Sequence, residues 1–230
     1  MVNIVGVGIA GTFVSYMTDV AERPYHSPRR EAQAAETHRV ILEAAGRLFV
    51  ERGFNAATIN AIAAEAGVSA VSVYGHFQTK ANLLRSWRQS LFFGLTDDER
   101  RGMQHAREQS DIERTLEIAV EWATPILVRL GPLYRVLRGA GSSDPVIAGQ
   151  LTEIDELRWA GCVEWDRIFR SKPGVSPALD PSTTTTVLWS LADPGQVLTN
   201  MTERQWSIDR YRRWYLDCFR MLYLAPAPGP

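Results

Sequence analysis

Residues 49–84 of the chain, FVERGFNAATINAIAAEAGVSAVSVYGHFQTKANLL, contain two short amphipathic segments separated by a glycine. Thr58 is a good N-cap for a helix in the first segment, and Gly67 ends that helix. Ser69 can cap a second helix that runs towards Phe77. Two short helices joined by a tight glycine turn form a helix-turn-helix, whose second helix fits the major groove of DNA. The stretch therefore predicts a DNA-reading unit.

An amphipathic helix is predicted directly before this unit. Apolar residues recur at spacings of three and four between Glu36 and Arg52, and Gly53 ends the pattern. A further helix is expected to begin near Thr79. Because the apolar residues of the reading helix pack against its neighbours, the first residues of that helix face outward, namely Ala70, Val71 and Ser72.

These residues, in this order and register, resemble the N-terminal domain of the TetR family of transcriptional regulators. The resemblance extends from about Thr37 to Leu84 and includes RGF at 52–54, AGVS at 66–69 and VYGHF at 73–77. It implies an all-α fold, with an N-terminal three-helix helix-turn-helix DNA-binding domain and a larger C-terminal helical domain for ligand binding and dimerisation. Val71 and Gly75 depart from the family pattern. A small residue or proline is common at position 71, and a larger residue is common at position 75.

The function implied by the resemblance is that of a regulator, with no enzymatic activity, no cofactor and no membrane partner. As a homodimer, a repressor of this kind binds a two-fold symmetric DNA operator, and it leaves the operator when a small-molecule effector binds the C-terminal domain. An activator, or a regulator that needs its ligand to bind DNA, is an open alternative.

The candidate DNA contacts divide into residues that read bases and residues that hold phosphates. Ala70 and Val71 can offer methyl groups to the C5 methyl of thymine, so we expect T-rich half-sites. Tyr74, His76 and Lys80 carry donors that can reach phosphate oxygens. The alternative for His76 is a surface histidine without a DNA contact, and the alternative for Lys80 is a solvated lysine. The resemblance adds Asn60, which can pair with adenine. The complete set is Thr58, Asn60, Ser69, Ala70, Val71, Ser72, Tyr74, His76 and Lys80.

Composition and charge fit this interpretation. The formal net charge is -1, which argues against a surface coated in basic residues, but residues 36–90 carry +2 and the remainder -3. Cys162 and Cys218 are the two cysteines, and they form no CxxC pair or zinc-ligand spacing. A disulfide scaffold and a metal site are therefore not expected, and a reducing cytoplasm fits best.

Residues 1–35 are expected to be an N-terminal arm. GVGIAG at 6–11 matches the GxGxxG dinucleotide fingerprint, which offers an enzyme as the competing function. That function needs a second strand, but the chain runs instead into Pro24 and Pro28. A start of translation at Met17 is the alternative, and it would leave residues 1–16 without function. The basic segment 23–30 can reach a minor groove or remain a plain tail.

Residues 36–84 form the predicted DNA-binding domain, residues 85–225 the larger domain, and residues 226–230 a tail. Helical periodicity continues through the larger domain, and Pro125 is expected to kink the helix that contains it. Glycine, serine and proline clusters separate the predicted helices, which cover 83–95, 111–130, 132–139, 145–171, 182–192 and 202–224.

Six of the seven tryptophans lie between residues 122 and 214 of the larger domain, where aromatic residues can line a ligand cavity or form a plain core. The candidate ligand-binding residues are Trp122, Tyr134, Trp159 and Cys162, with Glu121 and Asp155 as polar anchors. The last two long helices are rich in apolar residues. By the family resemblance, they form a four-helix dimer interface.

Overall fold

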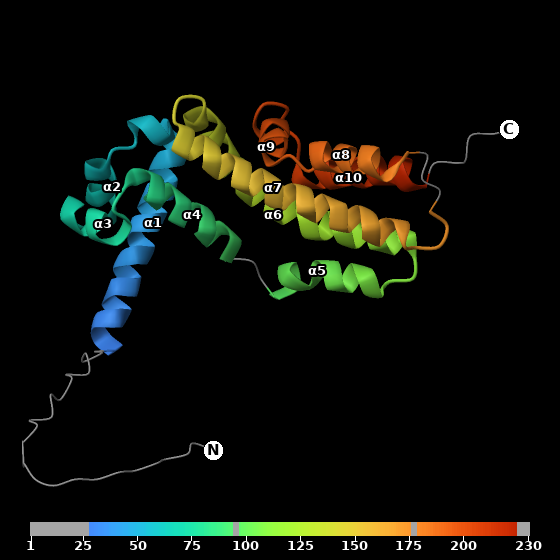
Figure 1. The fold of residues 1–230 in the computed structure, drawn as a ribbon, viewed down its shortest axis with the longest axis horizontal. Coiled ribbons are helices and arrows are strands. Elements are labelled where there is room, and N and C mark those ends of the chain that lie inside the picture. The colour runs from blue at the N-terminus through green and yellow to red at the C-terminus, as the bar shows by residue number, and fades with distance from the viewer. Residues whose placement is uncertain (1–27, 94–96, 176–178, 225–230) are drawn as a thin grey trace, which may run out of the picture.

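The computed structural model describes residues 28–93, 97–175 and 179–224, and within these ranges every regular element is an α-helix. The helices are α1 (Pro28–Ala56), α2 (Ile59–Ala66), α3 (Ala70–Phe77), α4 (Lys80–Phe93), α5 (Asp97–Glu108), α6 (Ile112–Gly141), α7 (Pro145–Arg170), α8 (Pro181–Leu191), α9 (Pro194–Thr202) and α10 (Ile208–Tyr223). Figure 1 shows an elongated molecule with α1–α4 at one end and the other helices grouped around α6 and α7. The predicted all-α class and the helix-turn-helix are confirmed.

Several helix boundaries differ from the predicted ones. α6 is one helix that contains both Pro125 and Pro132, where two helices were predicted. A proline removes a single backbone donor and costs about 3 kcal/mol, and the extensive burial of α6 offsets that loss. α5 and α9 were not predicted, and α10 begins at Ile208. Asp193 caps α9 through the backbone N–H of Gln196, so the Pro-Gly pair at 194–195 begins a helix instead of only ending one.

The first helix is also longer than predicted. α1 begins at Pro28, within the segment predicted as an arm, and continues through Gly53 to Ala56. Gly53 has a φ of 78°, so the chain bends there into the loop that leads to α2. The GxGxxG sequence, Met17 and the tail lie outside the described residues.

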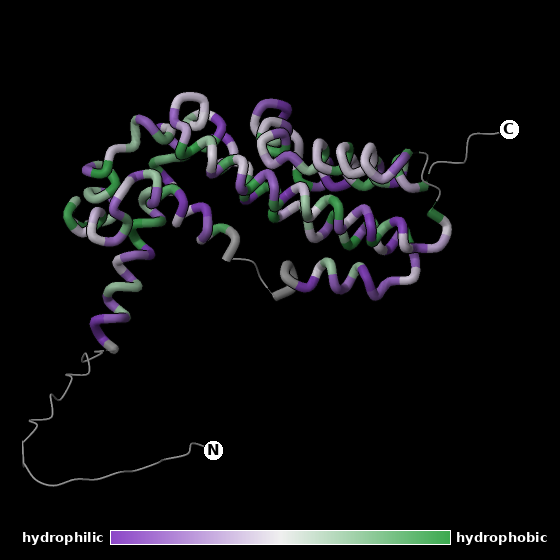
Figure 2. The backbone as a smooth tube through the Cα atoms, in the orientation of Figure 1, coloured by the Kyte–Doolittle hydropathy of each residue, from purple (hydrophilic) through white to green (hydrophobic). Residues whose placement is uncertain are grey.

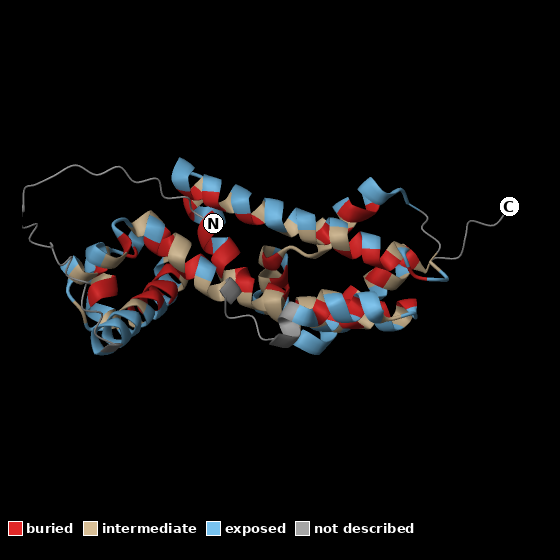
Figure 3. Ribbon diagram, turned by 60° about the horizontal axis from the view of Figure 1, so that its bottom comes forward, coloured by how far each residue is buried: buried red, intermediate tan, exposed pale blue. Residues whose placement is uncertain are grey.

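Two hydrophobic clusters form the interior of the molecule. The first joins buried residues of α1–α4 to one end of α6 and α7, including Leu133, Leu137 and Ile147. The second joins the other end of α6 and α7 to α5, α8, α9 and α10. Figure 3 shows the buried positions along the facing sides of these helices, and Figure 2 shows hydrophobic residues at α2, α3, α6 and α7. α6 and α7 therefore connect the two ends of the molecule.

α1 and α4 approach each other closely at Gly46. A Cβ atom on Gly46 would lie 2.3 Å from the indole nitrogen of Trp87. The missing side chain therefore lets Trp87 pack directly on the backbone of α1, which sets how α4 leaves the helix-turn-helix. None of the described helices is long and apolar enough to cross a membrane.

Candidate DNA-binding surface and ligand cavity

The two helices of the helix-turn-helix are capped as the sequence predicts. The Thr58 hydroxyl accepts a hydrogen bond from the backbone N–H of Ala61 at 3.1 Å, and the Ser69 hydroxyl accepts one from Ser72 at 3.1 Å. Gly67 ends α2 in the left-handed conformation with a φ of 68°. Because both hydroxyls bind their own helix, their first role is to position α2 and α3.

The outer face of α3 is apolar except for the phenol hydroxyl of Tyr74. Val71 is 80% exposed and Tyr74 is 52% exposed, whereas Val73 and Phe77 are buried in the domain core. Ala70 and Ser72 are half-buried beside them. The exposed set continues onto the start of α2 with Thr58 and Asn60, and onto the cap residue Ser69.

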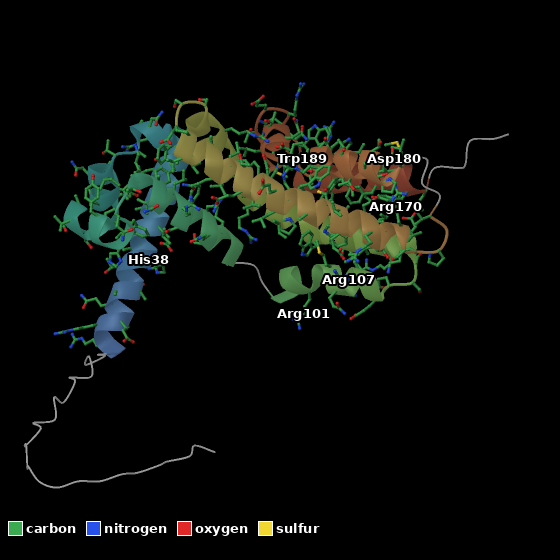
Figure 4. All side chains as sticks on the ribbon, in the orientation of Figure 1. His38, Arg101, Arg107, Arg170, Asp180 and Trp189 are labelled. Carbon is green, nitrogen blue, oxygen red and sulfur yellow. The ribbon has the colours of Figure 1, made fainter. Side chains whose placement is uncertain are left out.

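His76 lies on a different side of α3. Its ring contacts His38 of α1, with 6.0 Å between ring centroids, and the His38 ring packs on Phe77 at 4.8 Å. Burial lowers the pKa of His38, and the neighbouring His76 lowers it further. Figure 4 shows His38 on the part of α1 that lies beside the helix-turn-helix. The predicted contact of His76 with phosphate therefore has a competing role in packing α3 on α1.

Lys80 has partners inside the domain that the sequence did not suggest. Its ammonium donates to the carbonyl oxygens of Phe54 at 2.8 Å and Asn55 at 3.3 Å, and it lies 4.5 Å from the Phe54 ring centroid. The last carbonyls of a helix lack intrahelical donors, so Lys80 caps the end of α1 from another helix. Burial lowers the pKa of Lys80. The predicted contact of Lys80 with phosphate therefore stays a prediction and has a competing role in capping α1.

Two arginines of α1 have acidic partners. Arg39 binds Glu36 and Glu43 along α1, and Arg47 binds Glu65 of α2 at 3.1 Å. The hydrogen bonds to Glu36 and Glu43 raise the pKa of Arg39. The exposed face of α3 therefore presents neutral groups. Few ion pairs would have to break when this face meets another surface.

A cavity of about 200 Å³ lies between α6, α7 and α10. Its wall is almost entirely apolar and includes Trp122, Leu127, Tyr134, Cys162, Trp165 and Phe219. Trp122 and Trp165 lie against each other with 5.2 Å between ring centroids. Burial raises the pKa of the Cys162 thiol to about 11, so this sulfur is a neutral part of the wall.

Arg158 is the charged residue of the cavity wall, and its guanidinium is held by neighbours. It donates to the Asp155 carboxylate at 3.1 Å and to the carbonyl oxygens of Trp189 and Ala192. The hydroxyl of Tyr134 also donates to Asp155, at 3.2 Å. Asp155 therefore orients two wall residues, whereas the predicted role was that of a polar anchor for the ligand, and Asp155 itself does not line the cavity.

Three of the four predicted ligand-binding residues, Trp122, Tyr134 and Cys162, line this one cavity. Trp159 does not: it is 40% exposed and borders an open groove between α7 and α8. Glu121 is exposed and pairs with Arg114, so it is no anchor of the cavity. The helical period explains the difference, since Arg158, Cys162 and Trp165 share a face of α7 and residue 159 points elsewhere. The same period, applied from Cys162, would have identified Arg158 and Trp165.

α4 and α7 are joined by buried polar contacts. The Arg88 guanidinium donates to the backbone oxygen of Gln150 and to the Glu153 carboxylate, each at 2.8 Å. The Gln150 amide donates to the backbone oxygen of Ala81 at 3.0 Å, and Arg85 adds a second bond to Glu153. The hydrogen bond from Arg88, reinforced by Arg85, lowers the pKa of Glu153. We call Arg85, Arg88, Gln150 and Glu153 the α4–α7 contact.

Comparison with known proteins identifies the N-terminal part of the chain. Residues 41–86 match the model of the bacterial regulatory proteins of the tetR family. The HTH-type transcriptional repressor BepR of Brucella suis is 45% identical over 58 residues, which are 25% of this chain and 28% of that repressor. The chain thus matches only about a quarter of that relative's length in sequence.

Solved structures extend the likeness to the whole fold. A protein from Saccharomonospora viridis, solved in complex with choline, superimposes with a TM-score of 0.65 and 22% identity over 82% of this chain and 98% of that chain. The regulator FadR from Bacillus subtilis, in complex with stearoyl-CoA, superimposes with a TM-score of 0.63 and 16% identity over 80% of this chain and 97% of that chain.

Proposed function

We propose that the chain, whose residues 41–86 match the model of the bacterial regulatory proteins of the tetR family, is a repressor that a small-molecule effector releases from its operator. The observation that carries the proposal is the outer face of α3, where Val71 and Tyr74 are large, apolar and exposed on a helix that is otherwise well packed. Val71 and Tyr74 are neighbours one turn apart on α3, so their exposed side chains form one small apolar surface that supports an interaction there.

The groups on this face suit a DNA duplex. Tyr74 carries a neutral hydroxyl that can donate to a phosphate oxygen, and the methyl groups of Val71 can meet base edges in the major groove. Thr58, Ser69 and Asn60 lie on the same exposed side, at the beginnings of α2 and α3. Backbone N–H groups at helix N-termini favour phosphates.

Release from the operator requires a second site and a second copy of the chain. The apolar cavity is the proposed effector site. By the family resemblance, α8 and α10 would form the contact of a two-fold dimer in the cytoplasm. A dimer presents two α3 helices to half-sites about one helical turn apart. The two structural neighbours were solved with choline and with stearoyl-CoA, so the shared fold leaves the class of effector open.

Electrophoretic mobility shift with labelled DNA from around its own gene tests the proposal. We expect a dimer of the full chain to bind one fragment tightly and in a salt-dependent way. Tyr74→Ala should weaken this binding at least about tenfold, since it removes a hydrogen bond and packing at once. Val146→Ala, at an exposed valine of α7, serves as the control and should bind normally. A folded dimer that binds no fragment more tightly than random DNA would refute the repressor.

A further inference from the structure

The wall of the cavity offers no uncompensated charge to a ligand. Among the lining residues, Arg158 is the charged one, and Asp155 neutralises it directly. Its Nη1 group donates to the carbonyl oxygens of Trp189 and Ala192. A charged ligand would therefore lose its water in the cavity without gaining an ionic partner, which is costly.

The neutral polar groups of the wall are few as well. The Tyr134 hydroxyl is committed to Asp155. Burial raises the pKa of Tyr215 well above its ordinary value, so this phenol and the Cys162 thiol both stay uncharged. A ligand that depended on several hydrogen bonds would find few partners here.

The shape and size of the wall favour flat rings. Trp122, Trp165 and Phe219 present aromatic surfaces from α6, α7 and α10, and such surfaces pack well on another ring. A dry apolar cavity of about 150 Å³ in another protein binds benzene. A cavity of about 200 Å³ is therefore large enough for two fused rings.

We propose that the effector is an uncharged, hydrogen-bond-poor aromatic molecule about the size of two fused rings, bound between Trp122, Trp165 and Phe219. The proposal rests on the proposed function, because it names the ligand class of the effector site. Two fold neighbours were solved with other classes of ligand, a cation and a long acyl thioester, and a third, SmeT, was solved with the aromatic molecule triclosan.

Three probes with the same ring and different charge test the ligand class. Isothermal titration calorimetry of the full chain, without DNA at pH 7.5, compares neutral 2-methylnaphthalene with anionic 2-naphthoate and cationic 2-(aminomethyl)naphthalene. We expect the neutral probe to bind at least about tenfold more tightly than either charged one, because only the charged probes lose ionic hydration without a partner. Equal or tighter binding of a charged probe, or no binding of the neutral one, would overturn the proposal.

A matched pair of glycine variants tests the location. Gly161 and Gly149 both lie in α7 with open space where a Cβ atom would be added, but only Gly161 lines the cavity. Gly161→Leu should fill the cavity and weaken binding of 2-methylnaphthalene at least about tenfold, while Gly149→Leu should change it less than about twofold. Circular dichroism checks that both variants fold. If the two variants bind the probe equally, the proposed position of the ligand is wrong.

The failure of this proposal and that of the proposed function are distinguishable. The titrations measure ligand binding alone, and the mobility shift measures DNA binding alone. A chain that binds the neutral probe but no operator would keep the ligand class and lose the repressor. A chain that binds its operator but none of the three probes would keep the repressor and lose the ligand class.

Discussion

The reading helix α3 contains no lysine, arginine, aspartate or glutamate. Its two most exposed apolar side chains are Val71 and Tyr74, and the half-buried His76 lies against His38. Because side chains with charges or amides make the strong hydrogen bonds to purine edges, the proposed function implies that α3 discriminates bases mainly by methyl contact. Asn60, at the exposed start of α2, carries the amide that can add a hydrogen bond to a base.

The methyl contacts predict a specific sensitivity of the operator. Replacing a contacted thymine by uracil removes one methyl group, and we expect the operator to bind about fourfold more weakly for each such methyl. Val71→Ala should bind more weakly to the thymine operator and lose most of this difference. Quantitative mobility shifts with uracil at each half-site position, and at flanking positions as a control, measure the effect. Unchanged binding with every thymine replaced would refute methyl recognition.

His38 gives the DNA-reading end of the molecule a pH dependence. Burial, and then the neighbouring His76, lower the pKa of His38 below its ordinary 6.5. The unfolded chain then takes up a proton more readily than the folded one, so stability is complete above pH 6.5 and is lost as the pH falls below it. Thermal unfolding at pH 7.5 and 5.0 should show a larger decrease of Tm for the native chain than for His38→Gln. His105→Gln, at an exposed histidine of α5, should behave like the native chain.

At the scale of elements, α7 performs two tasks along its length. Its first half holds α4 through Gln150 and Glu153, and its second half lines the cavity with Arg158, Cys162 and Trp165. Any displacement of α7 by a ligand therefore reaches α4, the helix that follows the reading helix. A packed helix moves as a unit, so α7, like α6, physically connects the cavity to the helix-turn-helix.

The α4–α7 contact predicts a local change in stability. Glu153→Gln keeps the shape of the side chain but weakens the charge-assisted bonds from Arg88 and Arg85. We expect faster hydrogen exchange of the α4 amides, about two- to tenfold, with little change in α10. Glu156→Gln, at an exposed position of the same helix, is the matched control. Equal α4 exchange in both variants would show that the contact does not hold α4.

On the scale of the whole molecule, the hydrophobic interior does not divide at the predicted domain boundary after residue 84. The first cluster includes buried residues of α1–α4 together with Leu130, Leu133, Leu137, Ile147 and Ile154 of α6 and α7. The same two helices also contribute to the second cluster, through Leu116, Cys162 and Phe169. The helix-turn-helix therefore completes its core on helices of the larger domain.

This shared core predicts cooperative unfolding. Differential scanning calorimetry of the full chain should show one transition, with a calorimetric enthalpy close to the van't Hoff value once dimerisation is accounted for. A fragment of residues 28–93 should melt at least about 5 °C below the full chain, because the apolar surface that meets α6 and α7 is exposed to water. Two separate transitions, or a fragment as stable as the full chain, would show that the domains fold independently.

The sequence by itself determined the helical class and the helix-turn-helix, because these depend on local chemistry. Thr58, Gly67 and Ser69 cap or end helices through contacts within a few residues, and they do so wherever the chain lies. The tertiary structure decided what depends on partners distant in the sequence. Lys80 caps the end of α1, Trp159 faces away from the cavity, and Arg158 is neutralised by Asp155 beside carbonyls of α8 and its C-terminal end. The periodicity of apolar residues predicts which face of a helix is buried, but only the packing of the folded chain decides which neighbour that face meets.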